Sequence, residues 1–471
     1  MSTVDLLVKN CRLVQKDRIV DADLIIDEGK IKKISKGASK INSDRTVDAK
    51  ENLVMPGCID IHIHSREPHS PKVPANQEDF TSATRAAAAG GYTTVFDMPV
   101  TGAPPTTTLE GFKVKKGLAD EKCLVDYAFY GGAGFANIDE IKSLAEAGVV
   151  AFKIFTREIE PVDKQWMGVI LSGGSSDTFY RVMKKVAETG RILSIHCEDD
   201  RLIGFLADRL KSEGEVKLSA YYKSTPNASE FLEVARSIRL ARTTGARINI
   251  AHLSTAEAAS MVKNAKSEGV SIYAETCPHY LLLTDGDMVD NLGPFGKMYP
   301  PLRTEQDRTA LWRALEEGVI DFVATDHAPH SKEAKEPGWK NIFEAASGVP
   351  GLETALPLML TQMNLGQMDI FRLVDLMSRR PARAFGIDGR KGGLEVGMDA
   401  DFVVVDANRE AILREEGMHT KSSAKIFDGW QVKGVPVLTA VRGEVVMEDG
   451  EVLGKPGYGE YVFAGRVEGK S

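Results

Sequence analysis

Short apolar segments alternate with amphipathic segments through the middle of this 471-residue chain, and this alternation constrains the fold most. The apolar segments predict eight strands, at about residues 58–63, 93–97, 124–129, 149–154, 191–196, 247–252, 271–275 and 321–326. Helices are expected between most of them, at 79–89, 138–147, 178–189, 229–243, 255–267 and 305–316, and a further helix at 369–385 would close the wall. Eight strands in βα alternation predict an α/β protein with a TIM-type (β/α)8 barrel. A doubly wound sheet is the alternative, but no glycine-rich phosphate loop follows the first strand.

The two ends of the chain have a different pattern. Residues 1–55 and 389–471 contain short strand-like segments, with Asp27-Glu28-Gly29 and Glu448-Asp449-Gly450 as turns. Each end is too short to build a good core alone. We therefore predict that both ends pair into one small β-sandwich domain beside a barrel spanning residues 56–388.

Composition narrows the function classes. With 43% hydrophobic and 27% charged residues, disorder is not expected. A net charge of -8 offers no electrostatic footprint for nucleic acid or an anionic membrane. The five cysteines are scattered, and no apolar run reaches the roughly 18 residues of a membrane span. From the pattern of its first residues we expect no secretory signal. We expect a cytoplasmic protein with reduced thiols; a homo-oligomer is compatible with the sequence, which leaves the oligomeric state open.

The run Asp60-Ile61-His62-Ile63-His64 ends the first expected barrel strand. Because side chains alternate along a strand, His62 and His64 point the same way. Alone, such a pair is better explained as two surface histidines on an exposed strand. A metal site therefore requires further ligands downstream.

Four more polar residues end expected strands, at the face where barrel active sites lie. Lys153, His196, His252 and Asp326 end strands four, five, six and eight; Glu275 also ends a strand but has no supporting context. Each alone has a structural explanation, such as a hydrogen-bonded core histidine, a snorkelling lysine or a turn-capping aspartate. Together with the histidine pair they form an ordered set whose imidazoles and carboxylate suit zinc.

Four histidines and one aspartate can hold two metal ions if another anionic group bridges them. A neutral Lys153 amine could supply that group by reacting with carbon dioxide to give a carbamate, because burial beside cations lowers the pKa of lysine. The second bridge would be water or hydroxide, since zinc lowers the pKa of bound water from about 15.7 to about 7. The sequence thus predicts two divalent metal ions, zinc by preference, and a carbamate on Lys153.

This residue set resembles the amidohydrolase superfamily, specifically the cyclic amidohydrolases: dihydroorotases, allantoinases and hydantoinases. The resemblance spans essentially the whole chain. It implies a binuclear metal centre bound by His62, His64, carboxylated Lys153, His196, His252 and Asp326. It also implies that Asp326 takes a proton from the bridging hydroxide and delivers it to the leaving nitrogen.

Two motifs resemble dihydroorotases in particular. His64-Ser65-Arg66-Glu67-Pro68 is similar to their HFREP motif, whose arginine binds the substrate carboxylate, and Asp326-His327-Ala328-Pro329-His330 ends in a histidine that contacts the same group. The resemblance implies that Arg66 and His330 bind substrate, and a guanidinium–carboxylate fork suits that role. The structural alternatives are an ion pair at the barrel rim for Arg66 and a plain loop residue for His330.

Other features are closer to allantoinases and hydantoinases. Val100 and Tyr299 stand where dihydroorotases usually have asparagine, and Phe152-Lys153-Ile154-Phe155 resembles the GFK motif of the other two groups. We expect a metal-dependent hydrolase of a small cyclic amide, first a dihydroorotase, which reversibly converts dihydroorotate to N-carbamoyl-L-aspartate in pyrimidine biosynthesis. An allantoinase or a hydantoinase/dihydropyrimidinase-type enzyme is the alternative, and a non-catalytic scaffold of the same fold is a remote one.

Overall fold

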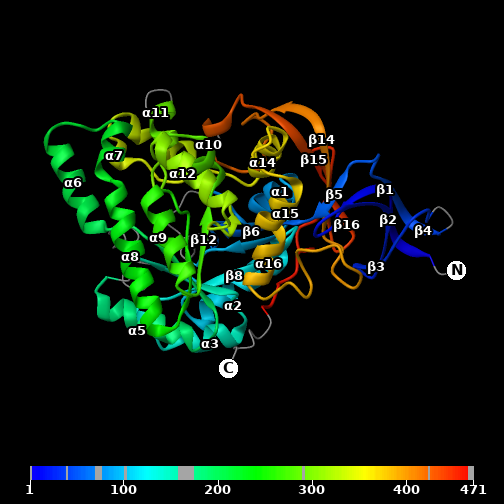
Figure 1. Ribbon diagram of the computed structural model, residues 1–471, viewed down its shortest axis with the longest axis horizontal. Coiled ribbons are helices and arrows are strands. Elements are labelled where there is room, and N and C mark those ends of the chain that lie inside the picture. Colours follow the sequence, from blue (N-terminus) through cyan, green and yellow to red (C-terminus); the bar gives the residue numbers. More distant parts are fainter. Residues whose placement is uncertain are drawn as a thin grey trace.

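The barrel is formed by eight parallel strands that neighbour one another in sequence order. The structure is a computed structural model that describes residues 3–38, 41–68, 77–99, 103–156, 174–288, 292–422 and 425–464. The strands are β6 (Cys58–Ile63), β7 (Tyr92–Asp97), β8 (Asp126–Gly132), β9 (Ala151–Phe155), β10 (Ile192–His196), β11 (Arg247–Ile250), β12 (Ile272–Thr276) and β13 (Phe322–Val323). A bridge between Ile63 and His327 joins the first strand to the segment after the last, so the sheet curls round on itself. The predicted TIM-type barrel is confirmed (Figure 1).

Helices cover the outside of the barrel. They are α1 (Phe80–Ala89), α2 (Leu109–Lys122), α3 (Glu140–Ala147), α5 (Ser176–Ala187), α8 (Asn227–Thr244), α9 (Ala256–Ser267), α12 (Glu305–Glu316), α14 (Ala355–Asn364), α15 (Ile370–Val374) and α16 (Arg380–Ala384). Outward-facing strand residues such as Phe152 and Ile250 share one core with helix residues such as Val182 and Val262. Strand alternation then places Lys153 and His196 on the inner face.

Shorter elements lie in the connections. Helices α6 (Asp200–Ser212) and α7 (Leu218–Ser224) lie between β10 and α8, and the connections beyond β12 and β13 hold α10 (Pro278–Leu282), α11 (Asp285–Met288) and α13 (Lys332–Lys335). None of the helices within the described residues combines the length and apolar character that crossing a membrane requires.

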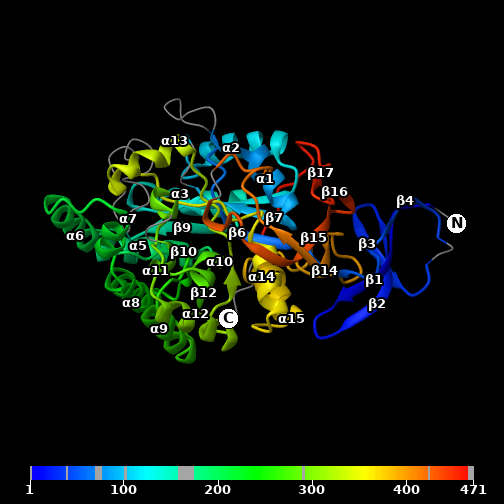
Figure 2. The same ribbon diagram turned by 90° about the horizontal axis from the view of Figure 1, so that it is seen from above.

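A second sheet combines the two ends of the chain. It contains β1 (Val4–Val14), β2 (Ile19–Asp27), β3 (Lys30–Ser35), β4 (Ser43–Asp48), β5 (Leu53–Pro56), β14 (Phe402–Ile412), β15 (Gln431–Val441), β16 (Glu444–Glu448) and β17 (Glu451–Val452). The ends join where β5 pairs with β1 on one side and β14 on the other. Residues from both ends, such as Leu24 and Phe402, share a core, and Figure 2 shows the blue and orange strands together. A unit built from both ends is thus confirmed, while its exact limits at residues 55 and 389 stay a prediction.

Beyond β17 the chain returns to the barrel. Tyr461 pairs with Tyr127 of β8, its hydroxyl donates to the Gly148 carbonyl over 3.1 Å, and the Val462 amide donates to the Tyr127 carbonyl over 2.8 Å. The C-terminal part of the described chain therefore contributes to the packing of both units.

Candidate metal centre

His62, His64 and Asp326 come together where β6 ends and the chain leaves β13. The Nε2 atoms of His62 and His64 lie 3.3 and 3.4 Å from Asp326 Oδ1, and one ligand atom from each of the three residues lies within 4.8 Å of the others. Ligands bound about 2.1 Å from one tetrahedral zinc ion are separated by about 3.4 Å. These three side chains therefore have the spacing of ligands to a single ion.

His196 and His252 form a second pair of buried imidazoles. His196 Nδ1 lies 2.9 Å from His252 Nε2, and the ring centres are 4.5 Å apart. The centre of the His252 ring lies 5.4 Å from that of His62, so the two groups of ligands are neighbours. The structure thus brings all four predicted histidines into one site.

Lys153 extends from β9 into the same site. Its side chain is fully buried, and Nζ has no hydrogen-bond partner among the described residues. Burial lowers the pKa of the amine, although the nearby Glu275 and Asp326 carboxylates partly oppose this. The strand runs through Phe155, so Lys153 lies at its middle rather than at its end.

Two of the predicted ligands lie beyond the strands expected to carry them. β11 ends at Ile250 and β13 at Val323, whereas the sequence predicts strands through His252 and Asp326. Both residues have left-handed backbones, with φ of 38° and 45°. Such a conformation ends a strand and costs of order 1–3 kcal/mol in a non-glycine residue, which proteins tolerate most often at functional sites.

The protonation states in the site are those that metal binding needs. Burial lowers the pKa of His64 to about 3 and that of His252 well below its usual value. Burial alone would raise the pKa of Asp326, but its interactions with His62, His64 and His252 hold it well below its usual range. At neutral pH the His64 and His252 imidazoles are neutral and the Asp326 carboxylate is ionised, as ligands must be.

Two buried glutamates contact the histidines, and sequence reasoning did not assign either one. Glu275 Oε1 pairs with His62 Nδ1, and Glu198 Oε2 lies 2.6 Å from His196 Nε2. Glu275 ends an expected strand, and its position on the inner face is the sequence feature that could have revealed its role. Glu198 follows His196 by two residues, and only the fold shows that they meet.

Arg66 and His330 contact each other beside these ligands. Arg66 Nη2 lies 2.8 Å from His330 Nε2, and its Nε donates to the Pro329 carbonyl over 3.0 Å. Arg66 has a left-handed backbone, with φ of 65°. Burial and the neighbouring guanidinium lower the pKa of His330, so its neutral ring can accept a hydrogen bond from Arg66. The two predicted substrate-binding residues thus form one unit.

The positions that distinguish possible substrates are only partly described. The ring of Tyr299 lies 5.5 Å from that of Tyr221 on α7, within a small aromatic cluster. Val100 lies outside the described residues. At Tyr299, therefore, an aromatic side chain with apolar neighbours stands in place of a short amide.

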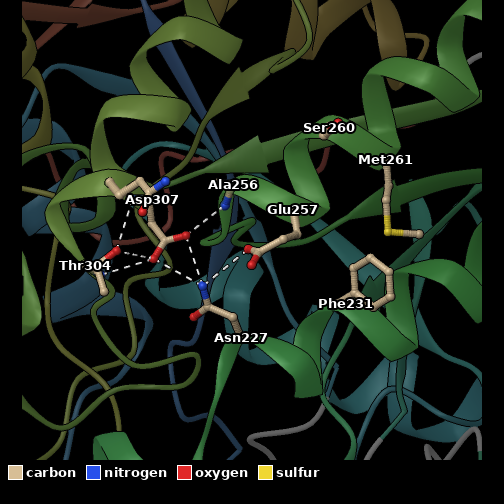
Figure 3. A pocket seen from close by; sticks show the side chains of 9 residues that line it. Asn227, Phe231, Ala256, Glu257, Ser260, Met261, Thr304 and Asp307 are labelled. Atoms are coloured by element: carbon tan, nitrogen blue, oxygen red, sulfur yellow. Dashed lines mark hydrogen bonds between the residues drawn. The ribbon is translucent and has the colours of Figure 1, made fainter.

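A separate hollow lies between α8, α9 and α12 (Figure 3). Its polar groups bond to one another: Asn227 Nδ2 and the Ala256 amide each donate to Asp307 Oδ1 over 3.0 Å. The residues that line it include none of the predicted ligands. These bonds tie the starts of three helices together.

Comparison with known proteins identifies the family. The model of the amidohydrolase family matches residues 53–446. An L-hydantoinase from Paenarthrobacter aurescens is 37% identical over 97% of this chain and 98% of its own length. A dihydroorotase from Methanosarcina mazei is 36% identical (97% of each chain), and an allantoinase from Rubrobacter xylanophilus is 34% identical (100% of each).

A comparison with solved structures also finds a hydantoinase. That of L-hydantoinase (dihydropyrimidinase) from Arthrobacter aurescens has a TM-score of 0.92 and 36% identity, and covers 98% of this chain and 100% of that one. The chain belongs to the amidohydrolase family, and within it to the cyclic amidohydrolases.

Proposed function

We propose that this cyclic amidohydrolase uses two divalent metal ions, zinc by preference, and that its substrate is dihydroorotate. The observation that carries the metal assignment is the fully buried Lys153 amine, which has no hydrogen-bond partner among the described residues. It is within electrostatic reach of both Asp326 and His252, which belong to the two groups of ligands. A carbamate on Lys153 would give these groups a common anionic ligand.

The donor set fits two such ions. His62, His64 and Asp326 would hold one, His196 and His252 would hold the other, and carboxylated Lys153 would belong to both. When bound, the ions would polarise the substrate carbonyl and provide a hydroxide nucleophile at neutral pH. The low pKa values of His64 and His252 support this assignment, because only neutral imidazole binds a metal.

The residues of the chain account for the proton transfer. Asp326 is ionised at neutral pH and would take the proton of the attacking water oxygen as that oxygen bonds to the ring carbonyl carbon. The same proton would pass to the ring nitrogen as the carbon–nitrogen bond breaks. Asp326 would then be ionised again and ready for another turnover.

Arg66 and His330 would orient the substrate by its carboxylate. Their mutual contact and their positions near His64 and Asp326 in the chain support this role. A guanidinium recognises a planar carboxylate through paired hydrogen bonds. Dihydroorotate carries such a group, whereas hydantoin, dihydrouracil and allantoin do not.

A hydantoinase-type activity is the second candidate. It is favoured by Tyr299, whose ring packs on Tyr221 where dihydroorotases usually have an asparagine. The similarity to an L-hydantoinase over almost the whole chain also supports it. An apolar wall suits a ring with a hydrophobic substituent.

A substrate panel separates the candidates. The zinc-loaded enzyme is assayed at neutral pH with dihydroorotate, hydantoin, dihydrouracil and allantoin. We expect the highest kcat/KM with dihydroorotate, together with ring closure of N-carbamoyl-L-aspartate in the reverse direction. Turnover of an uncharged ring without turnover of dihydroorotate would contradict the substrate assignment and leave the metal assignment intact.

A further inference from the structure

Glu275 is a fully buried carboxylate on the inner face of β12. Burying a charge is costly unless hydrogen bonds compensate it. Oε2 accepts a hydrogen bond from Asn249 Nδ2 over 2.8 Å, and the same amide nitrogen lies 3.1 Å from Ser194 Oγ. Oε1 contacts both His62 Nδ1 and the backbone amide of His252, the latter over 3.2 Å. Glu275 thus contacts residues of β6 and β11 directly and reaches β10 through Asn249.

The contact with His62 determines which nitrogen of that ring is protonated. A carboxylate can only accept a hydrogen bond, so a neutral His62 must carry its proton on Nδ1. The lone pair is then on Nε2. Nε2 is the atom that lies 3.3 Å from Asp326 Oδ1, on the side of the three-residue group. Glu275 therefore selects the tautomer in which His62 can bind a metal ion.

The contact with His252 acts on the second pair of ligands. The His252 backbone has φ of 38°, and Glu275 Oε1 accepts the amide hydrogen of that same residue. This bond stabilises the turn that presents His252 Nε2 to His196 Nδ1. One carboxylate oxygen thus serves both groups of ligands, through a side chain in one and through the backbone in the other.

Glu198 provides a local counterpart. Its Oε2 lies 2.6 Å from His196 Nε2, so a neutral His196 carries its proton there and has its lone pair on Nδ1, which faces His252. This contact involves the second pair of histidines, whereas the contacts of Glu275 involve both pairs. Substituting Glu198 therefore provides a comparison for substituting Glu275.

We propose that Glu275 is a positioning residue that couples the two halves of the metal centre, by setting the His62 tautomer and supporting the His252 turn. This inference rests on the proposed binuclear centre. Carboxylates that orient metal-binding histidines typically account for 10–100-fold in metal affinity or activity. A glutamine cannot replace Glu275, because its single acceptor oxygen cannot serve His62 and Asn249 together.

The test compares Glu275→Gln and Glu198→Gln with the wild-type chain. Zinc affinity is measured by chelator competition, and the melting temperature is measured on the metal-free proteins. We expect Glu275→Gln to weaken both zinc equivalents by about 10–100-fold, and Glu198→Gln to weaken one. In metal-free protein labelled with ¹⁵N-histidine, we expect His62 to be protonated on Nδ1 in the wild type and to lose this preference in Glu275→Gln.

Glu353→Gln is the matched control. Glu353 Oε1 also lies near a histidine, 3.0 Å from His419 Nδ1, but His419 is not a proposed ligand. Its substitution is expected to leave zinc affinity unchanged. If Glu275→Gln binds zinc like the wild type and only its melting temperature falls, the residue is merely structural and the proposal is wrong. A wild-type chain that binds no zinc would overturn the proposed centre itself, and this inference with it.

Discussion

Lys153 shows how a single position creates reactivity. A lysine on the outside of a barrel would stay protonated, but on the inner face of β9 burial lowers the pKa of Lys153 and so favours its neutral form. A neutral amine can react with carbon dioxide. The resulting carbamate would lie beside the other proposed metal ligands and could share metal ions with them.

Lys153→Ala should therefore lose metal and activity together. Without the proposed bridging anion, the histidines have no common ligand, so zinc per chain falls well below the wild-type value. Millimolar propionate should restore part of the zinc content and the activity, whereas propylamine, which has no carboxylate, should restore neither. Metal analysis after dialysis is the measurement, and wild-type zinc content in the variant would count against the carbamate.

Arg66→Ala tests how the substrate is held. Loss of a charged hydrogen-bonding partner costs about 2–3 kcal/mol, so kcat/KM for dihydroorotate should fall about 100-fold while zinc content stays at the wild-type value. Steady-state kinetics with dihydroorotate and with an uncharged ring provide the comparison. An equal loss with both substrates would show that Arg66 maintains the loop rather than the carboxylate contact.

Sequence reasoning was most effective for residues whose chemistry and strand position agree. The four histidines, Lys153 and Asp326 were predicted because metal-binding residue types followed apolar segments, and the fold brings them together. Glu275 also ends an expected strand, but its role depends on contacts across the barrel that the sequence does not show. Its partners His62 and Asn249 are 213 and 26 residues away in sequence, and neither spacing carries a local signal.

At the scale of elements, strongly patterned segments were predicted well and weakly patterned ones were missed. Helices α9 and α12 were predicted closely because apolar residues recur on one face. Helix α2 contains two glycines and seven lysine or acidic residues among few apolar ones, so its sequence lacks that signal. Helices α6 and α7 were not predicted, because they lie between β10 and α8 in addition to the one helix that a βα repeat requires there.

Two buried lysines connect the loops above the barrel. Lys297 donates to the carbonyls of Ile342 and Ala345 over 2.9 and 2.7 Å. Lys335 of α13 lies 3.3–3.5 Å from the carbonyls of Pro294, Lys297 and Ala346. These contacts hold the loop that contains Tyr299 against the segment that follows His330.

Lys335 should make stability depend on pH. Burial, Lys297 and Arg66 lower its pKa from 10.5 to about 7, so between these values the folded chain binds fewer protons than the unfolded one. Stability should therefore increase from pH 7 to 10, by up to about 5 kcal/mol from this group. Relative to Lys335→Met, the wild type should gain stability over that range in urea unfolding. The exposed Lys332→Met is the control, and equal pH profiles for wild type and Lys335→Met would contradict the assignment.

A buried ion network joins the barrel to the second sheet. Lys391 Nζ pairs with Asp126 at the start of β8 and lies 2.6 Å from Asp401 and 3.1 Å from Asp399, beside β14. All four side chains are almost fully buried. The network fixes the start of one barrel strand to the sheet built from the chain ends.

Lys391→Met should destabilise the protein by about 3–5 kcal/mol, because it removes the ion-pair partner of the buried Asp401 carboxylate and weakens the pairing of Asp126 and Asp399. Lys30→Met is the control: Lys30 lies 2.6 Å from the same Asp399, but its side chain is 44% exposed, so about 1 kcal/mol or less is expected. Urea unfolding of the two variants gives the comparison. Similar losses of unfolding free energy in both variants would show that the buried network around Lys391 does not join the barrel to the second sheet.

At the scale of the whole molecule, one barrel carries the proposed ligands and a sheet from both chain ends packs beside it. The predicted barrel and the pairing of the ends are confirmed. They could be predicted because strand–helix alternation and the total length leave few alternative folds. The packing of Tyr461 against Tyr127 was not predicted, since the local sequence around Tyr461 does not indicate which residue it contacts. Membership of the cyclic amidohydrolases agrees with this architecture.

The most direct test of the account is the zinc content of the purified wild-type chain. Protein is prepared in zinc-replete buffer containing bicarbonate, dialysed to remove loosely held metal, and analysed by inductively coupled plasma mass spectrometry. The account predicts two zinc ions per chain, held by the four histidines, Asp326 and carboxylated Lys153. Less than one zinc ion per chain would contradict it.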